Sequence, residues 1–158
     1  MRPHEIFASM TPEHAEAVFR RLAKESPAMF LQAVHAAAIA LKSRPQFLMK
    51  QPMERRTSAV RRALARVSSA AVAEEILAVY FLECRRDVLV EWLDLIGLAH
   101  DEGALEVASP PSPPAAELEK HVAAYRAKDD DLDRELLLQA FAAQNSIDWP
   151  DLEALLHK

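Results

Sequence analysis

Histidine and acidic side chains are the groups in this 158-residue chain that could bind a metal ion. Helical zinc and di-iron sites use His-Glu-x-x-His or Glu-x-x-His spacing, and neither spacing occurs here. The run His100-Asp101-Glu102 is expected in a turn, where adjacent side chains seldom converge on one ion. The run Asp129-Asp130-Asp131 lacks the spaced acids and the glycine of a calcium loop, so it is interpreted as a cap of the next helix. We expect no metal site and no cofactor.

Nucleophilic side chains are equally few. Cys84 is the only cysteine, and although Arg85 and Arg86 follow it, no His-Asn or His-Asp arrangement supports a reactive thiol. It is interpreted as a small buried hydrophobic residue. His35 lies in an apolar helical segment and is interpreted as a core histidine. We assign no catalytic residue and favour a non-enzymatic protein, with a helical enzyme that uses an unseen pocket near His35 as an alternative.

Charge is distributed unevenly along the chain. Residues 1–72 contain 12 basic and 5 acidic residues, whereas residues 73–158 contain 7 basic and 19 acidic residues. The basic excess is densest from Lys42 to Arg66, where Glu54 is the only acid. Such asymmetry bears on association rather than on fold, so it predicts an interaction surface.

Helical spacing collects these charges on single faces. On a helix over residues 53–67, Arg55, Arg62 and Arg66 form one ridge opposite an apolar seam. After Asp87, the residues Asp87, Glu91 and Asp94 form an acidic ridge on another helix. Three interpretations of the arginine ridge remain open: a solvated or internally paired face, a contact with an acidic protein surface such as a second copy, or a nucleic-acid contact.

The nucleic-acid interpretation would use Lys50, Arg55, Arg56, Arg62 and Arg66, because arginine and lysine bind phosphate. No aromatic residues alternate with these arginines within the helix, as base stacking would need. The sequence pI of about 5.7 also gives little long-range attraction to DNA or RNA. A protein partner or a second copy is therefore the preferred partner.

The elements that must position these residues are predicted to be helices. The chain has 29 alanines and 20 leucines but only two glycines, which excludes dinucleotide-binding and P-loop folds. Thr11-Pro12 and Ser26-Pro27 predict helix starts, and Gly97 predicts a helix end. Residues 27–43 and 71–84 are nearly all apolar and are expected to be central core helices. A short turn is expected over residues 46–49.

We therefore predict an all-α fold. A compact bundle of five to six helices spans residues 1–107, a proline-rich linker spans 108–114, and a helical C-terminal segment spans 115–158. This last segment is too small to fold alone and is expected to pack on the bundle, on a second copy or on a partner. Its Leu152, Leu155 and Leu156 match a Leu-x-x-Leu-Leu docking pattern and are candidate partner-binding residues, together with Arg55, Arg62 and Arg66.

The expected function is protein–protein interaction, as an adaptor or a self-associating subunit. The N-terminus lacks an apolar signal segment, and no uncharged apolar run is long enough to cross a membrane. With one cysteine, the chain forms no internal disulfide. These features predict a cytoplasmic protein without membrane contact.

Overall fold

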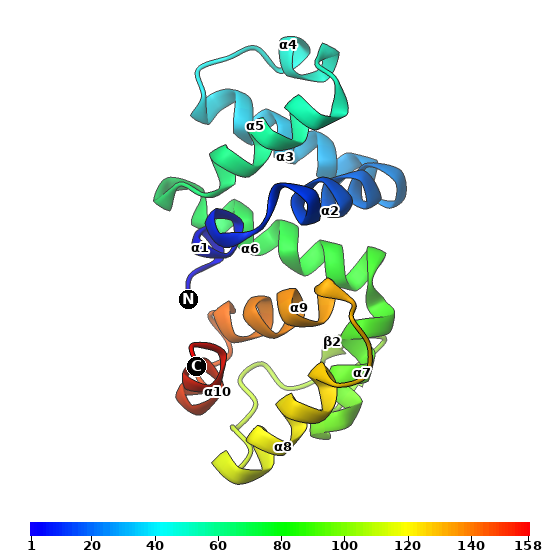
Figure 1. The fold of residues 1–158 in the computed structure, drawn as a ribbon, viewed down its shortest axis with the longest axis vertical. Coiled ribbons are helices and arrows are strands. Elements are labelled where there is room, and N and C mark those ends of the chain that lie inside the picture. Colours follow the sequence, from blue (N-terminus) through cyan, green and yellow to red (C-terminus); the bar gives the residue numbers. More distant parts are fainter. The chain divides into compact units, whose positions relative to one another are not determined.

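Proline residues begin half of the α-helices of this protein. The computed structural model describes residues 1–158 and contains ten α-helices, five of which have proline in their first turn (Figure 1). Proline suits the first helical position, because its fixed φ is helical and no carbonyl partner exists there for an N–H. The predicted starts at Pro12 and Pro27 are confirmed, and Pro150 begins the last helix in the same way. The fold is all-α, with one short hairpin in addition.

Two compact units make up the chain. They are the N-terminal unit, Arg2–Cys84, and the C-terminal unit, Arg85–Lys158, with which Met1 is grouped. This boundary does not coincide with the predicted division at residues 108–114, which lie inside the C-terminal unit. None of the helices combines the length and the apolar character needed to cross a bilayer.

The N-terminal unit is built around α2, α3, α5 and α6, which pack against one another. Its core contains the stacked rings of Phe7 and Phe19, whose centroids are 5.9 Å apart, together with Leu22, Val34 and Leu64. Its elements, in chain order, are α1 (Pro3–Ser9), α2 (Pro12–Glu25), α3 (Pro27–Ala40), α4 (Pro45–Lys50), α5 (Met53–Leu64), a 3₁₀ turn (Val67–Ser69), α6 (Ala70–Val79) and a π-helical turn (Tyr80–Cys84).

The apolar segments of this unit differ from their predictions. Helix α3 packs on α2, α4, α5 and α6, but it is buried on one face only: Leu31 and Ile39 are 44% and 81% exposed, and His35 is exposed as well. The predicted helix over 71–84 ends at Val79 and continues as a π-helical turn. The predicted turn over 46–49 is the helix α4, which Pro45 begins. Helix α1 was not predicted, since its seven residues are too few to show a helical period.

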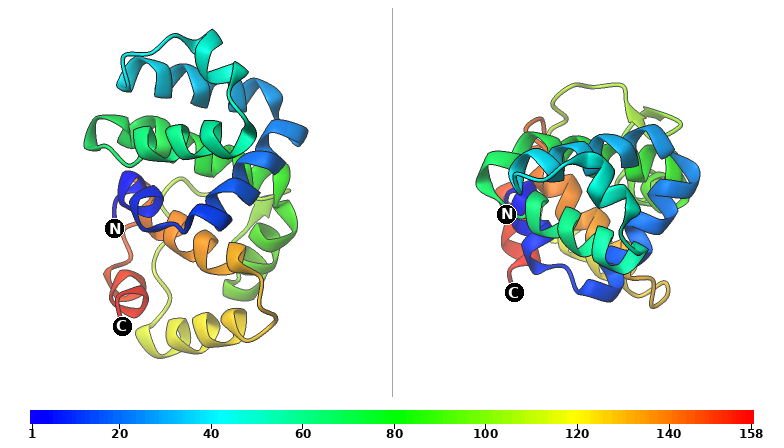
Figure 2. Two further views of the ribbon diagram at one scale, coloured as in Figure 1. Left: turned by 45° about the horizontal axis from the view of Figure 1, so that its top comes forward. Right: turned by 90° about the horizontal axis from the view of Figure 1, so that it is seen from above.

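The C-terminal unit consists of the last helix of the predicted bundle, the proline-rich segment 108–114 and the C-terminal segment 115–158. It contains α7 (Arg86–Ile96), a hairpin of β1 (His100–Asp101) and β2 (Ala104–Leu105), α8 (Ala115–Arg126), α9 (Leu132–Ala143) and α10 (Pro150–Leu156). Helix α7 packs on α8 and α9, and α10 packs on α8 and α9 as well, as Figure 2 also shows.

Aromatic contacts fill the core of the C-terminal unit. The ring of Trp92 meets the rings of Tyr125 and Phe141 edge-on at 5.3 and 6.0 Å, and Phe141 meets Trp149 at 5.2 Å. The Tyr125 hydroxyl donates a hydrogen bond to the Val88 carbonyl at 2.7 Å. Through these contacts the C-terminal segment 115–158, which was expected to be too small to fold alone, shares a core with the apolar face of α7.

Candidate interaction surface

Helix α5 presents two arginines to solvent because its other face is buried. Thr57, Val60 and Leu64 lie at helical spacing and are almost completely buried in the core of the N-terminal unit. Arg55 and Arg62 lie on the opposite face and are exposed. This arrangement is the amphipathic pattern predicted for residues 53–67, although the helix ends at Leu64.

The three arginines of the predicted ridge differ in their hydrogen bonds. Arg55 and Arg62 form no ion pair or hydrogen bond. Arg66 lies beyond the end of α5, and its guanidinium donates a hydrogen bond to the Ala40 carbonyl at the end of α3. The structure therefore keeps Arg55 and Arg62 together as free cations and uses Arg66 to connect two segments of its own unit.

The other two basic residues suggested for nucleic-acid binding, Lys50 and Arg56, differ in their exposure to solvent. Lys50 is exposed at the end of α4. Arg56 is half-buried, with its guanidinium 5.8 Å from the Phe30 ring centroid and one nitrogen donating to the Met49 carbonyl at 3.3 Å. Arg56 thus holds α4, α5 and α3 together, which leaves little of it for a ligand.

A groove lies between α4 and α5 beside the free arginines. We call it the basic groove; its volume is about 340 Å³, and it is lined by Phe47, Leu48, Gln51, Glu54, Arg55, Ser58, Ala59 and Arg62. Phe47 is 59% exposed, whereas Leu48 and Ala59 form a buried apolar floor. The groove therefore combines two guanidinium groups, one accessible aromatic ring and a small apolar bed.

Phe47 is the residue of this groove that the sequence analysis missed. The segment 46–49 was expected to be a turn, and turns give no information about which side chain faces which helix. The pair Arg44-Pro45 could have indicated this helix from the sequence, because proline is common at the first position of a helix. A helix places Phe47 and Leu48 on adjoining faces, one exposed and one buried.

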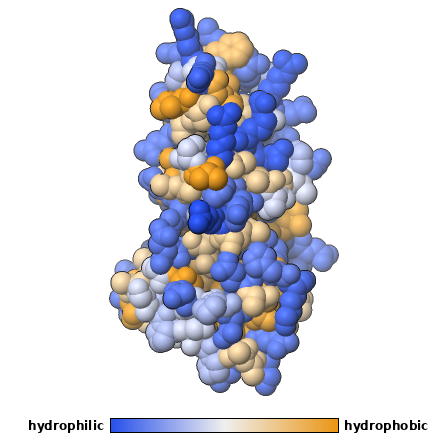
Figure 3. Space-filling view, turned by 90° about the vertical axis from the view of Figure 1, so that its left-hand side faces the viewer, coloured by the Kyte–Doolittle hydropathy of each residue, from blue (hydrophilic) through white to orange (hydrophobic).

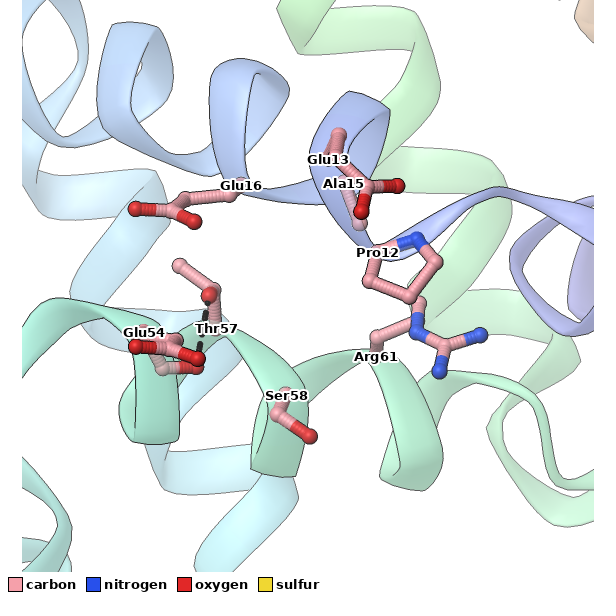
Figure 4. A pocket seen from close by; sticks show the side chains of 8 residues that line it. All are labelled: Pro12, Glu13, Ala15, Glu16, Glu54, Thr57, Ser58 and Arg61. Carbon is pink, nitrogen blue, oxygen red and sulfur yellow. Dashed lines mark hydrogen bonds between the residues drawn. The ribbon is translucent and has the colours of Figure 1, made fainter.

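A second, smaller crevice opens between α2 and α5, as Figure 4 shows. Its volume is about 180 Å³, and Glu13, Glu16, Glu54 and Arg61 contribute its charged groups. Arg20 binds Glu16 at 2.7 Å, and Arg61 donates to the Met10 carbonyl at 3.2 Å. These acids do not form a group of three or more that could hold a metal ion. The crevice is thus a polar seam between two packed helices.

The acidic ridge of α7, in contrast to the arginines of the basic groove, contacts side chains of its own unit. Asp87 pairs with Arg85 at 3.1 Å, Glu91 with Arg134 at 2.6 Å, and Asp94 with His100 at 2.7 Å. Asp87 lies in the first turn of α7, which begins at Arg86. None of the three acids is left without a cationic or histidine partner.

Arg85 is the centre of a buried charge cluster at the start of the C-terminal unit. Its guanidinium donates to Asp87, to Asp131 at 2.7 Å and to Asp133 at 2.9 Å, and its side chain is only 10% exposed. Hydrogen bonds from Arg85 hold the pKa of Asp87 and of Asp131 below the usual value. Because ionised carboxylates surround the guanidinium, its charge is compensated despite burial.

Arg134 forms a second cluster on α9. It binds Asp129 through two nitrogens, at 2.8 and 3.1 Å, and Glu91 through a third, and it lies 4.9 Å from the Tyr125 ring centroid. The hydrogen bond from Arg134 and one from the Asp131 backbone N–H lower the pKa of Asp129 to about 2. Asp131 is the N-cap of α9 and accepts from the Asp133 N–H, which confirms the predicted capping role of the acidic run.

The leucines of the docking pattern are engaged within the C-terminal unit. Leu152 is completely buried, while Leu155 and Leu156 are half-buried. Helix α10 packs on α8 and α9, and the Trp149 indole N–H donates to the Pro110 carbonyl at 2.9 Å. The pattern therefore builds the core of its own unit, and it offers no free row of leucines to a partner.

Cys84 and His35, which the sequence analysis weighed for catalysis, have different surroundings. Burial, followed by the charges of Glu25 and Glu83, raises the pKa of the Cys84 thiol to about 11, so the thiol is protonated at neutral pH. His35 is exposed on α3, contrary to its interpretation as a core histidine. The Glu25 carboxylate, which forms a hydrogen bond with the thiol, raises the thiol pKa and so disfavours the reactive thiolate.

The large exposed hydrophobic side chains come from several different elements of the chain. On the face drawn in Figure 3 they form small patches that hydrophilic side chains separate. The large exposed hydrophobic residues lie mostly in the N-terminal unit: Leu31, Ile39, Phe47, Met49 and Val67, with Val107 and Leu132 in the C-terminal unit. Among these, Phe47 lines the basic groove.

No family model matches this chain, and comparison with curated proteins and with solved structures finds no significant match.

Proposed function

We propose that this chain is a non-enzymatic interaction protein that binds an acidic protein segment in the basic groove. The proposal rests on one observation: Arg55 and Arg62 are exposed and without partners beside the accessible Phe47 ring. Arginine and aromatic residues contribute most of the binding energy in protein interfaces. The single cysteine is compatible with action in the cytoplasm, which is part of the proposal.

The lining of the groove supports a protein segment over a polyanion. Glu54 and Gln51 lie in the same groove as the arginines, and their side-chain oxygens accept hydrogen bonds. A peptide offers both carboxylates for the arginines and N–H groups for these acceptors, whereas a phosphate backbone offers acceptors only. An apolar side chain of the peptide would rest on Leu48 and Ala59 beside Phe47.

Fluorescence anisotropy with two labelled probes tests this proposal. One probe is a helical peptide of glutamate, leucine and alanine, and the other is a single-stranded oligonucleotide of similar charge. We expect the peptide to bind, and Arg55→Glu/Arg62→Glu to weaken its binding by about tenfold or more, since each arginine–carboxylate bond is charge-assisted. The control Arg21→Glu/Lys24→Glu makes the same charge change on exposed residues of α2 that do not line the groove.

Two results would contradict the proposal. One is the absence of peptide binding at low salt. The other is peptide binding that the groove variant and the control variant reduce equally, since general electrostatic attraction would explain it.

A second candidate function, nucleic-acid binding, is favoured by the position of Phe47. The sequence offered no aromatic residue among the arginines, yet α4 brings Phe47 beside Arg55 and Arg62, and base stacking on such a ring is sequence-tolerant. Tighter binding of the oligonucleotide than of the peptide, with a steep loss on adding salt, would select this candidate.

A further inference from the structure

The two units carry opposite net charges. The N-terminal unit has 12 basic and 8 acidic residues, whereas residues 85–158 have 7 basic and 16 acidic residues. Many acids of the C-terminal unit are used internally, as described for α7 and α9. Several others are exposed and without a partner: Asp101, Glu106, Glu117, Glu119, Asp130, Asp148 and Asp151. The same chain thus contains an unneutralised basic surface and unneutralised carboxylates.

Three of these free carboxylates lie on two elements that the fold brings together. Glu117 is in the first turn of α8, and Asp148 and Asp151 flank the start of α10. The Trp149 hydrogen bond to Pro110 ties the start of α10 to the segment that leads into α8. Figures 1 and 2 show α10 beside the first half of α8. We call Glu117, Asp148 and Asp151 the acidic patch.

Exposed prolines accompany the acidic patch. Pro114 precedes α8 and Pro150 begins α10, and both are exposed. Aromatic grooves bind proline-containing segments, because the proline ring is apolar and already restricts the backbone before binding. The patch therefore offers carboxylates and an apolar group, which are the complements of Arg55, Arg62 and Phe47.

We infer that the basic groove binds the acidic patch of a second copy of this chain. Arg55 and Arg62 pair with carboxylates of the patch, and Phe47 packs on a proline. Each copy contributes a groove and a patch, so the copies associate either as a closed dimer that uses both contacts or head to tail. This inference rests on the proposed function, because it names the acidic segment that the groove binds.

Sedimentation velocity of the full-length chain, from micromolar to millimolar concentration, tests the inference. We expect a concentration-dependent increase in mass that salt weakens, since exposed charges are screened. Arg55→Glu/Arg62→Glu and Glu117→Lys/Asp148→Lys/Asp151→Lys should each weaken association by about tenfold or more. The controls are Arg21→Glu/Lys24→Glu and Asp101→Lys/Glu106→Lys. Circular dichroism establishes that every variant remains helical.

The decisive measurement mixes the charge-reversed groove variant, Arg55→Glu/Arg62→Glu, with the charge-reversed patch variant, Glu117→Lys/Asp148→Lys/Asp151→Lys. The glutamates that replace the arginines face the lysines that replace the acids, and the unchanged arginines face the unchanged acids. An equimolar mixture should therefore associate about tenfold or more tightly than either variant alone. A chain that stays monomeric at millimolar concentration overturns the inference, as does association that the reversals leave unchanged or that the mixture fails to restore. Binding of the acidic peptide by a strictly monomeric chain would overturn this inference alone and leave the proposed function intact.

Discussion

At the scale of single residues, burial decides which arginines are paired. Arg85 and Arg134 have side chains only 10% and 7% exposed, and each binds several carboxylates. An unpaired buried charge would cost several kcal/mol, so a sequence that buries arginine must supply acids around it. Arg55 and Arg62 remain in water, where an unpaired charge costs little, and they stay available to a ligand.

Replacing Arg85 should damage the C-terminal unit severely. Arg85→Met keeps an unbranched apolar stem but removes the guanidinium, which leaves the buried Asp133 carboxylate without this partner. We expect the free energy of unfolding to fall by about 3–5 kcal/mol. Urea unfolding monitored by tryptophan fluorescence measures the loss, and both tryptophans, Trp92 and Trp149, lie in this unit.

The exposed pair Arg126–Glu135 is the matched control for Arg85. Its two side chains are 40% and 42% exposed, although the guanidinium geometry is equally good. Arg126→Met should therefore cost no more than about 1 kcal/mol. Similar losses in the two variants would show that burial does not set the strength of these ion pairs.

At the scale of elements, helix starts could be predicted from the sequence better than helix ends. Pro12, Pro27 and Pro150 fix their own backbone, so the start is a local property. The ends of α5 and α6 depend on packing: α5 stops at Leu64 and α6 gives way to a π-helical turn, and no local residue signals either change. Gly97 is the exception, because its αL conformation is a local requirement that the sequence reveals.

Gly97 offers a direct test of that local requirement. It ends α7 with φ +74°, and no atom lies within 4 Å of the position that a Cβ would take. Gly97→Ala should therefore destabilise the C-terminal unit through backbone strain alone, by about 1–2 kcal/mol. Gly97→Asn should cost less, because asparagine tolerates the left-handed conformation. Equal unfolding midpoints in urea for the two variants would contradict this explanation.

The candidate site could be predicted only in part, because part of it depends on packing between elements. The face that Arg55 and Arg62 share follows from the helical period of one element, so the sequence predicted it. The groove needs Phe47 from α4 opposite α5, and this contact depends on the route of the chain between two helices. The pairing of the acidic ridge was missed likewise, since its partner Arg134 lies on α9, far along the chain from Glu91.

At the scale of the whole molecule, the two units use their charges differently. The C-terminal unit uses many of its acids to compensate Arg85 and Arg134, so its stability depends on those acids being ionised. The N-terminal unit exposes much of its basic excess between Lys42 and Arg66. Charge in the C-terminal unit stabilises the fold, whereas in our proposal the charge of the N-terminal unit serves association.

Acid should therefore weaken the C-terminal unit over a defined pH interval. In the unfolded chain, Asp carboxyls titrate near pH ~3.9. In the folded unit, hydrogen bonds from Arg85 and Arg134 hold the pKa of Asp87, Asp131 and Asp129 lower, that of Asp129 at about 2. The unfolded state thus binds more protons in this interval, so the stabilisation is complete above pH ~4 and is lost as the pH falls toward ~2.

Asp129→Asn separates this linkage from general acid effects. The variant loses the carboxylate that binds Arg134 through two bonds, so it should unfold at lower urea concentration than the wild type at neutral pH. It also lacks one carboxyl with a lowered pKa, so its tryptophan-monitored unfolding midpoint should fall less steeply between pH ~4 and ~2. Asp101→Asn, at an exposed carboxyl that forms no ion pair, should follow the wild-type curve. If all three proteins showed the same slope in this interval, the pairing of Asp129 with Arg134 would not be the origin of the acid sensitivity, and the charge of the unit as a whole would have to explain it.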